Sequence, residues 1–143
     1  MQKQLEKKHL APYECFDLKV LWMDMVATLV SSDKLNVDLY VDQKFYTAMK
    51  NIKPILRPLD LSKPITHKGE TFVPMQRLDS ITTLTYTDID ILHNSTEDSN
   101  TRRFLPIWII EKLHEWLFDT QYLLESGLAI SVDSLTVNPY EIL

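Results

Sequence analysis

The sequence predicts an α+β fold: a single domain, residues 1–143, in which one long C-terminal amphipathic helix and several short helices cover an antiparallel sheet. Apolar and polar residues alternate between Cys15 and Asp42, as they do in half-buried strands. After Pro106 the apolar residues recur at helical spacing instead. The chain has 143 residues, of which 45% are hydrophobic and 24% charged, values that are ordinary for one folded domain.

The first half of the chain is predicted to be mainly strand. Residues 2–10 should form a short helix, and three strands within residues 15–42 should pair as a meander, because consecutive strands usually pair. Phe45 to Ile52 is expected to form another short helix that ends before Pro54. Residues 53–65 contain three prolines and should be extended.

The middle of the chain is predicted to form a hairpin and one further strand. His67 to Glu70 should be the turn of a hairpin whose second arm is Thr71 to Val73, followed by a helical turn from Met75 to Leu78. Residues 82–92 alternate and are rich in β-branched side chains, which predicts a strand. The polar residues 93–100 predict a loop.

The long helix is predicted to begin at Pro106, because proline is tolerated in a first helical turn. Its apolar face contains six residues: Ile109, Ile110, Leu113, Trp116, Leu117 and Thr120. The helix should continue through Glu125 and stop at Gly127, since glycine often follows a helix end. Residues 128–132 should then form a short strand or a packed tail.

We expect no cofactor and no metal. The two glycines, Gly69 and Gly127, are far apart, which excludes the glycine-rich loops that hold nucleotide phosphates. Glu111 and His114 have the spacing of a di-iron helix, but the second such pair that this site needs is missing from the sequence.

We also expect no enzyme. Cys15 lies between Glu14 and Asp17, which oppose thiolate formation, so it should be buried and inert. Asp88 and Asp90 could form an acid–base pair on one face of a strand, although an exposed strand face explains them more simply. A small enzyme would need a pocket built around these residues.

A cytoplasmic location is expected. The N-terminal residues lack the apolar stretch of a secretory signal, and no apolar run approaches the length of a membrane-spanning helix. A single cysteine fits a reducing compartment.

The net charge of −5 is unevenly distributed along the chain. Residues 43–77 contain seven basic and two acidic residues, whereas residues 111–143 contain one basic and six acidic residues. These segments could neutralise each other in the fold, or the basic segment could bind nucleic acid or an acidic protein. The acidic segment could instead compete for the basic groove of a partner.

Two sets of residues are candidates for binding. The predicted helix has apolar residues on more than one side, so either loops of the domain or a partner should cover it. The expected partner contacts on this helix are Trp108, Lys112, Glu115 and Asp119. The alternative is nucleic-acid binding by four residues of the basic segment, Lys44, Lys50, Lys53 and Arg57.

Several motifs resemble a set of small bacteriophage and prophage proteins. They are Ala11-Pro12-Tyr13, KPILRPL from Lys53, HKGETFVP from His67, WIIEKLHEW from Trp108 with Phe118-Asp119, and ESGLAI from Glu125. The motifs cover about half of the chain in the same order. Similar sequences often have histidine where this chain has Leu117, which further weakens a metal site on this helix.

The resemblance implies a phage origin and expression inside a bacterial cell, and it carries over no catalytic residue. We therefore expect a non-enzymatic interaction protein, with a host protein as partner. Inhibition of a host defence nuclease, such as a CRISPR effector, is the leading hypothesis. The alternatives are an accessory nucleic-acid-binding phage protein and a structural or replication-associated phage component.

Overall fold

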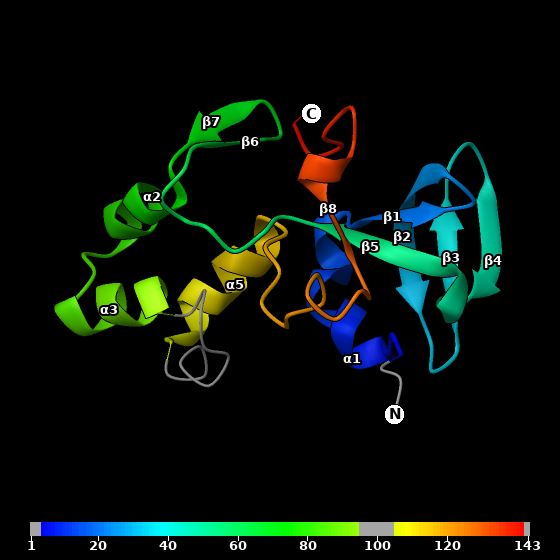
Figure 1. The fold of residues 1–143 in the computed structure, drawn as a ribbon, viewed down its shortest axis with the longest axis horizontal. Helices are drawn as coiled ribbons and strands as arrows, with labels where there is room; N and C mark the ends of the chain where they lie inside the picture. Colours follow the sequence, from blue (N-terminus) through cyan, green and yellow to red (C-terminus); the bar gives the residue numbers. More distant parts are fainter. Residues whose placement is uncertain (1–3, 95–104, 142–143) are drawn as a thin grey trace.

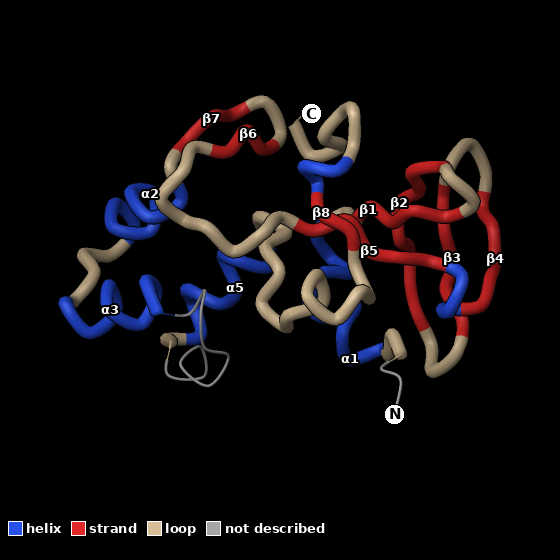
Figure 2. The backbone as a smooth tube through the Cα atoms, in the orientation of Figure 1, coloured by secondary structure: helices blue, strands red, loops and turns tan. Residues whose placement is uncertain are grey.

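The computed structural model describes residues 4–94 and 105–141, and in the first range it describes side chains up to residue 90. A six-stranded sheet forms one half of the molecule (Figures 1 and 2). Its order is β4-β3-β2-β1-β5-β8, and all neighbours are antiparallel except β5 and β8. The strands are β1 (Lys19–Trp22), β2 (Met25–Ser32), β3 (Asn36–Tyr40), β4 (Lys44–Ala48), β5 (Ile52–Leu56) and β8 (Ile130–Ser131).

The predicted N-terminal meander is confirmed. β1, β2 and β3 pair in succession, with Val20 opposite Ala27 and Leu29 opposite Leu39, and all four side chains are buried. The register shifts between Leu29 and Ser31, where β2 bulges. The alternation of apolar residues thus identifies the side of the sheet that faces the core.

The helix predicted from Phe45 to Ile52 is wrong. Residues 44–48 form β4, in which Phe45 lies opposite Leu39, and only the 3-10 turn η2 (Met49–Asn51) separates β4 from β5. Pairing with β3 places Phe45 against the core while Tyr46 remains exposed. The proline-rich segment is extended in β5, as predicted.

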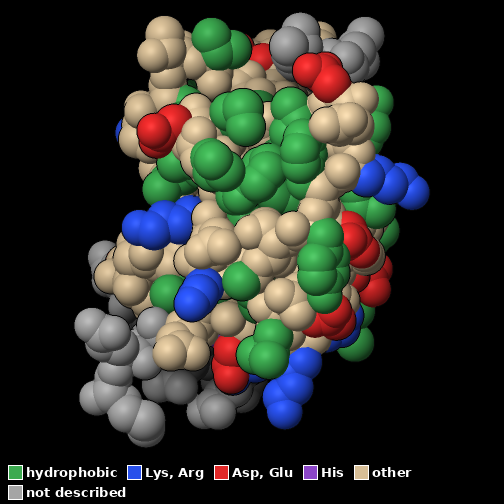
Figure 3. Space-filling view, turned by 90° about the vertical axis from the view of Figure 1, so that its right-hand side faces the viewer, with side chains coloured by type: hydrophobic (Ala, Val, Ile, Leu, Met, Phe, Trp, Pro, Cys, Tyr) green, Lys and Arg blue, Asp and Glu red, His purple; other side chains and the backbone are tan. Residues whose placement is uncertain are grey.

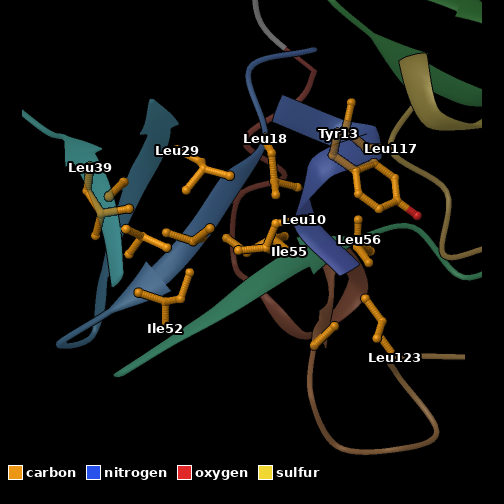
Figure 4. Packing of buried hydrophobic residues seen from close by; sticks show 14 of the residues in the cluster. Leu10, Tyr13, Leu18, Leu29, Leu39, Ile52, Ile55, Leu56, Leu117 and Leu123 are labelled. Carbon is orange, nitrogen blue, oxygen red and sulfur yellow. The ribbon is translucent and has the colours of Figure 1, made fainter. Parts of the chain in front are cut away.

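Two short helical segments cover one side of the sheet. They are α1 (Lys7–Leu10) and η1 (Ala11–Phe16), so the helix predicted for residues 2–10 begins only at Lys7 in the described part of the chain. Leu10 and Tyr13 are fully buried and belong to the same hydrophobic cluster as Leu18, Leu29 and Ile55 (Figure 4).

Among the described residues, the other half of the molecule contains a hairpin and three helices. They are β6 (Ile65–His67), β7 (Glu70–Phe72), α2 (Pro74–Ile81), α3 (Tyr86–Asn94) and α5 (Ile107–Glu115). The predicted hairpin and the helical turn after it are confirmed. These elements surround a second hydrophobic cluster: Leu61, Leu78, Leu84, Leu105, Ile109, Leu113, Trp116 and Phe118. The α+β class is thereby confirmed, and the single domain of residues 1–143 stays a prediction.

The strand predicted for residues 82–92 is wrong, because α3 occupies most of this range. The Asp88 amide donates to the Thr85 hydroxyl at 3.1 Å, and the Thr85 amide donates to the Asp88 carboxylate at 3.3 Å. This reciprocal pair caps the start of a helix, and its spacing is visible in the sequence. The predicted polar loop at residues 93–100 is helical at residues 93 and 94, and its remainder lies outside the described residues.

The prediction of a long C-terminal helix is also wrong, because α5 ends at Glu115. The Leu117 amide donates to the His114 carbonyl at 2.9 Å, and the Phe118 amide donates to the Leu113 carbonyl at 2.9 Å. These two bonds form a Schellman motif, which needs a residue of positive φ after the helix. Leu117, with φ of 61°, takes that position although glycine is the usual residue there.

The chain after α5 returns to the sheet. Arg57 and Phe118 form an isolated parallel bridge, and Ile130 then pairs with Ile55 in β8, within the strand predicted for residues 128–132. Gly127 has positive φ, as expected, but it follows a series of turns rather than a long helix. The turn η3 (Val132–Ser134) leads into the C-terminal tail.

The buried phenol of Tyr140 ties this tail to the sheet. It donates to the Ile55 carbonyl at 2.6 Å and accepts from the Lys19 amide at 2.8 Å. We predict that Tyr140→Phe lowers the free energy of unfolding by about 2 kcal/mol, because two backbone groups lose their partner. Chemical denaturation measures this loss. Tyr86→Phe is the control, since Tyr86 is 91% exposed and its change should leave stability unaltered; equal effects of both changes would contradict the assignment.

Candidate interaction surfaces

The core-facing side of the sheet extends beyond its helical cover at the ends of two hairpins. Trp22 pairs with Met25 across the β1–β2 hairpin, on the same side as buried Val20 and Ala27. The rings of Trp22 and Phe45 lie 5.0 Å apart, so β4 contributes to the same surface. We call Trp22, Met23, Met25 and Phe45 the hairpin patch.

The hairpin patch is accessible. Met23 is 73% exposed and Met25 is 43% exposed, and Trp22 and Phe45 are half-buried. Figure 3 shows hydrophobic side chains gathered on the face of the molecule that lies at the right of Figure 1, with acidic and basic side chains around them. Exposed Asp24 and Asp42 belong to the two turns, and exposed Lys44 begins β4. An apolar centre with a charged rim is the usual composition of a protein–protein interface.

The sequence interpretation missed this surface. The alternation between Cys15 and Asp42 gives the correct side of the sheet for Trp22 but not the extent of the helical cover. A signal was present in Met23, because a large apolar side chain is unusual at a tight turn. Met23 and Asp24 both have positive φ, which fits the two central residues of such a hairpin turn.

Three of the four predicted helix contacts lie on α5. Trp108 is half-buried and packs on the second hydrophobic cluster, while Lys112 and Glu115 form an ion pair at 2.8 Å. Lys112 and Glu115 line a pocket of about 400 Å³ between α5, α2 and the β6–β7 hairpin. Trp108 does not line this pocket.

The wall of this pocket opposite α5 is formed by β7 and α2, whose side chains contact one another. Arg77 lies over the Phe72 ring at 4.2 Å and forms an ion pair with Glu70. The Phe72 ring lies 5.0 Å from Trp116. Arg77 pairs with Glu70 and Lys112 pairs with Glu115, so these four charges balance within the pocket. Lys68 also lines the pocket and pairs with Asp17 at 4.0 Å.

Asp119, the fourth predicted contact, is 2% exposed, so it has no surface to offer a partner. One carboxylate oxygen accepts from the amides of Gln121 and Leu123 at 3.2 and 3.0 Å, and the other accepts from the Leu124 amide at 2.9 Å. The carboxylate stabilises the turn that follows α5, and its predicted role in binding is replaced by this structural one.

The four basic residues of the nucleic-acid alternative do not all share one surface. Lys50 and Lys53 line a common groove, Lys44 is exposed on β4 outside that groove, and Arg57 is 4% exposed. Its guanidinium donates to the Trp116 carbonyl at 3.0 Å and the Thr66 carbonyl at 2.9 Å. Arg57 therefore cannot contact phosphate in this fold, and that part of the prediction is wrong.

The residues weighed for chemistry do not assemble into a site in the described part of the chain. Cys15 is exposed rather than buried, and Asp88 and Asp90 lie on α3 rather than on a strand. No group of three or more metal-ligating side chains occurs among the described residues. Among these residues, no helix combines the length and the apolar character needed to cross a membrane.

His67 is a buried titratable group whose pKa affects the stability of the protein in acid. Burial, together with the positive charges of Arg57 and Lys68, lowers the pKa of His67 from 6.5 to about 4. The His67 Nδ1 atom lies 3.3 Å from the Arg57 guanidinium. Since arginine only donates, the neutral ring accepts at this atom and has its proton on Nε2.

Comparisons with protein-family models, with curated proteins and with solved structures gave no match to this chain.

Removal of the Asp119 carboxylate should destabilise the fold. We predict that Asp119→Ala lowers the free energy of unfolding by about 2–3 kcal/mol, because three backbone amides lose their acceptor. Glu111→Ala on α5 is the matched control, since Glu111 is exposed and its loss should cost under about 0.5 kcal/mol. Urea denaturation of both variants measures the difference, and equal stability of the two would show that the Asp119 bonds contribute nothing.

The protein should lose stability in mild acid. Because the folded pKa of His67 is about 4 and the ordinary value is 6.5, the unfolded chain binds a proton first as pH falls through this window. The contribution of His67 is fully present above pH 6.5 and declines by about 3 kcal/mol towards pH 4. His114, whose pKa burial also lowers, acts in the same direction.

The variant His67→Gln isolates this contribution. It keeps a hydrogen-bond acceptor for Arg57 and cannot titrate, so its stability should fall less steeply between pH 6.5 and 4 than that of the unmodified protein. Denaturation curves at several pH values give the two slopes. Identical slopes would rule out His67 as a source of the acid sensitivity.

Proposed function

We propose that the protein is a non-enzymatic, phage-encoded interaction protein that binds a host protein through the hairpin patch inside the bacterial cell. The observation that carries this proposal is the uncovered part of the core-facing side of the sheet. Trp22, Met25 and Phe45 continue the apolar surface that α1 and η1 cover elsewhere. Aromatic residues and methionine are enriched in interface cores, and an apolar patch of this kind commonly marks a binding site.

The partner that fits this patch presents an apolar surface with basic side chains around it. Asp24 and Asp42 flank the patch, and the whole chain has a net charge of −5. A second copy of the chain would bring the same two carboxylates against them, so self-association through this surface is disfavoured. Phosphates of a nucleic acid would meet the same repulsion.

A nucleic-acid-processing host protein meets these requirements, because its substrate groove is basic. The phage-like motifs support such a target, since phage proteins gain from blocking a defence nuclease. We therefore propose inhibition of a host defence nuclease, such as a CRISPR effector, by occupation of a protein surface. This proposal needs no catalytic group on the chain.

The first test asks whether the protein blocks a nuclease in cells. Bacteria with an active CRISPR system are transformed with a targeted plasmid, with and without expression of the protein, across a panel of effector types. The proposal predicts restored transformation with one type and a stoichiometric complex of the two purified proteins. If every effector type still blocks transformation by the plasmid, the proposal that the protein inhibits a CRISPR nuclease is contradicted. If the protein alone retards nucleic acid in a gel, the alternative of a nucleic-acid-binding protein is favoured.

Charge placed in the hairpin patch should abolish binding. We predict that Met23→Glu together with Met25→Glu weakens the purified complex by at least about 30-fold, the effect of losing one binding hot spot. Isothermal titration calorimetry measures the affinity, and circular dichroism confirms folding. Val137→Glu is the control, because Val137 is 66% exposed but lies in the C-terminal tail.

The same measurement separates the two candidate surfaces. The double variant Lys112→Ala and Glu115→Ala removes the ion pair on α5 without altering the hairpin patch. Unchanged affinity of this variant supports the patch. Loss of affinity here, with normal binding by the Met23 and Met25 variant, would assign the interface to α5 instead.

A further inference from the structure

A second recessed surface lies in the half of the molecule that contains the six-stranded sheet, away from the α5 pocket. It is a groove of about 520 Å³ where the segment before α1, the start of β3, η2 and the start of β5 meet residues 127–128. Its lining residues are Gln4, Leu5, Lys34, Leu35, Asn36, Ala48, Met49, Lys50, Ile52, Lys53, Gly127 and Leu128. This volume is in the range of sites that hold small organic ligands.

The apolar part of the groove is aliphatic. Leu5, Leu35, Met49, Ile52 and Leu128 provide it, and the lining includes no aromatic side chain. A nucleobase or another flat ring would find no stacking partner among these residues. Leu35 is 70% exposed, an unusual state for a leucine beside other apolar side chains, and a bound alkyl chain would remove it from water.

The charged part of the groove is entirely basic. Lys34, Lys50 and Lys53 line it, and the lining includes no aspartate or glutamate. Within the described residues none of the three lysines forms an ion pair. The neighbouring carboxylate of Asp33 accepts the amides of Leu35 and Asn36 at 3.0 and 2.8 Å, so backbone donors of its own turn engage it.

We propose that this groove binds a small anionic amphiphile, with an alkyl chain along the leucines and a carboxylate or phosphate head at the lysines. Charge complementarity selects the anion, and the aliphatic lining selects the chain. The ammonium groups of lysine bind either head group as point charges, so a fatty acid and an alkyl phosphate share the recognised chemistry. This site is separate from the hairpin patch and does not depend on the proposed function.

Four probes of equal chain length test the assignment. Decanoate, decyl phosphate, decanol and decyltrimethylammonium are titrated below their micelle concentrations into the full chain and followed by methyl NMR and calorimetry. The proposal predicts saturable binding of the two anions, with shifts at Leu35, Met49 and Leu128, and at least tenfold weaker binding of the alcohol and the cation. Comparison of decanoate with decyl phosphate distinguishes the two head groups.

Variants locate the site. Lys34→Glu with Lys50→Glu should weaken anion binding at least tenfold, and Leu35→Asp should do the same through loss of the apolar contact. Lys44→Glu is the matched control, because Lys44 is exposed but does not line the groove, and its affinity should be unchanged. Equal binding of the cation, no saturable binding of either anion, or equal effects of the control variant would each overturn the proposal. Binding only to phosphatidylglycerol vesicles, without binding of the monomeric probes, would overturn it in favour of a membrane surface.

Discussion

Arg57 connects the two halves of the molecule, and the packing of both hydrophobic clusters depends on its bonds. Its amide donates to the Leu117 carbonyl at 2.8 Å, and its carbonyl accepts from the Asp119 amide at 2.9 Å. The buried guanidinium donates to carbonyls of Trp116 and Thr66. Burial lowers the pKa of Arg57, but arginine stays ionised at neutral pH, so these acceptors replace the water that the cation has lost.

This junction also explains why α5 is short. Leu117 is buried in the cluster beneath the sheet, and Phe118 is buried in the cluster of α2 and α5. The chain has to turn between them, and the bridge between Arg57 and Phe118 fixes where it turns. Apolar periodicity after Pro106 continues past this point, so a local pattern predicts a longer helix. The Schellman bonds that end α5 are local, but Arg57, which holds Leu117 and Phe118 in this turn, lies about sixty positions earlier in the chain, and periodicity carries no information about it.

The sequence predicted well where local pattern and tertiary structure agree. The meander and the β6–β7 hairpin are of this kind, because alternation and turn residues specify both. The spacing of Thr85 and Asp88 predicts the start of α3, but the β-branched residues around them favour a strand instead. The candidate site fared worse, because Arg57 and Asp119 are residue types that usually lie at the surface. Both residues are buried because they lie where the two halves of the molecule meet. The hairpin patch is exposed because α1 and η1 do not reach that part of the sheet. No local sequence pattern shows either fact.

The two proposed surfaces are neighbours, yet their charges make one shared ligand unfavourable. Trp22 of the hairpin patch lies opposite Ile52 of the groove in the pairing of β1 with β5. Two carboxylates and one lysine, Lys44, flank the patch, whereas the groove is lined by lysines alone among its charged residues. A basic partner that fits the patch is repelled by the groove, and an anion that fits the groove is repelled by the patch. Trp22 and Ile52 also pack in the same hydrophobic cluster beneath the sheet, so the two surfaces share one part of the core.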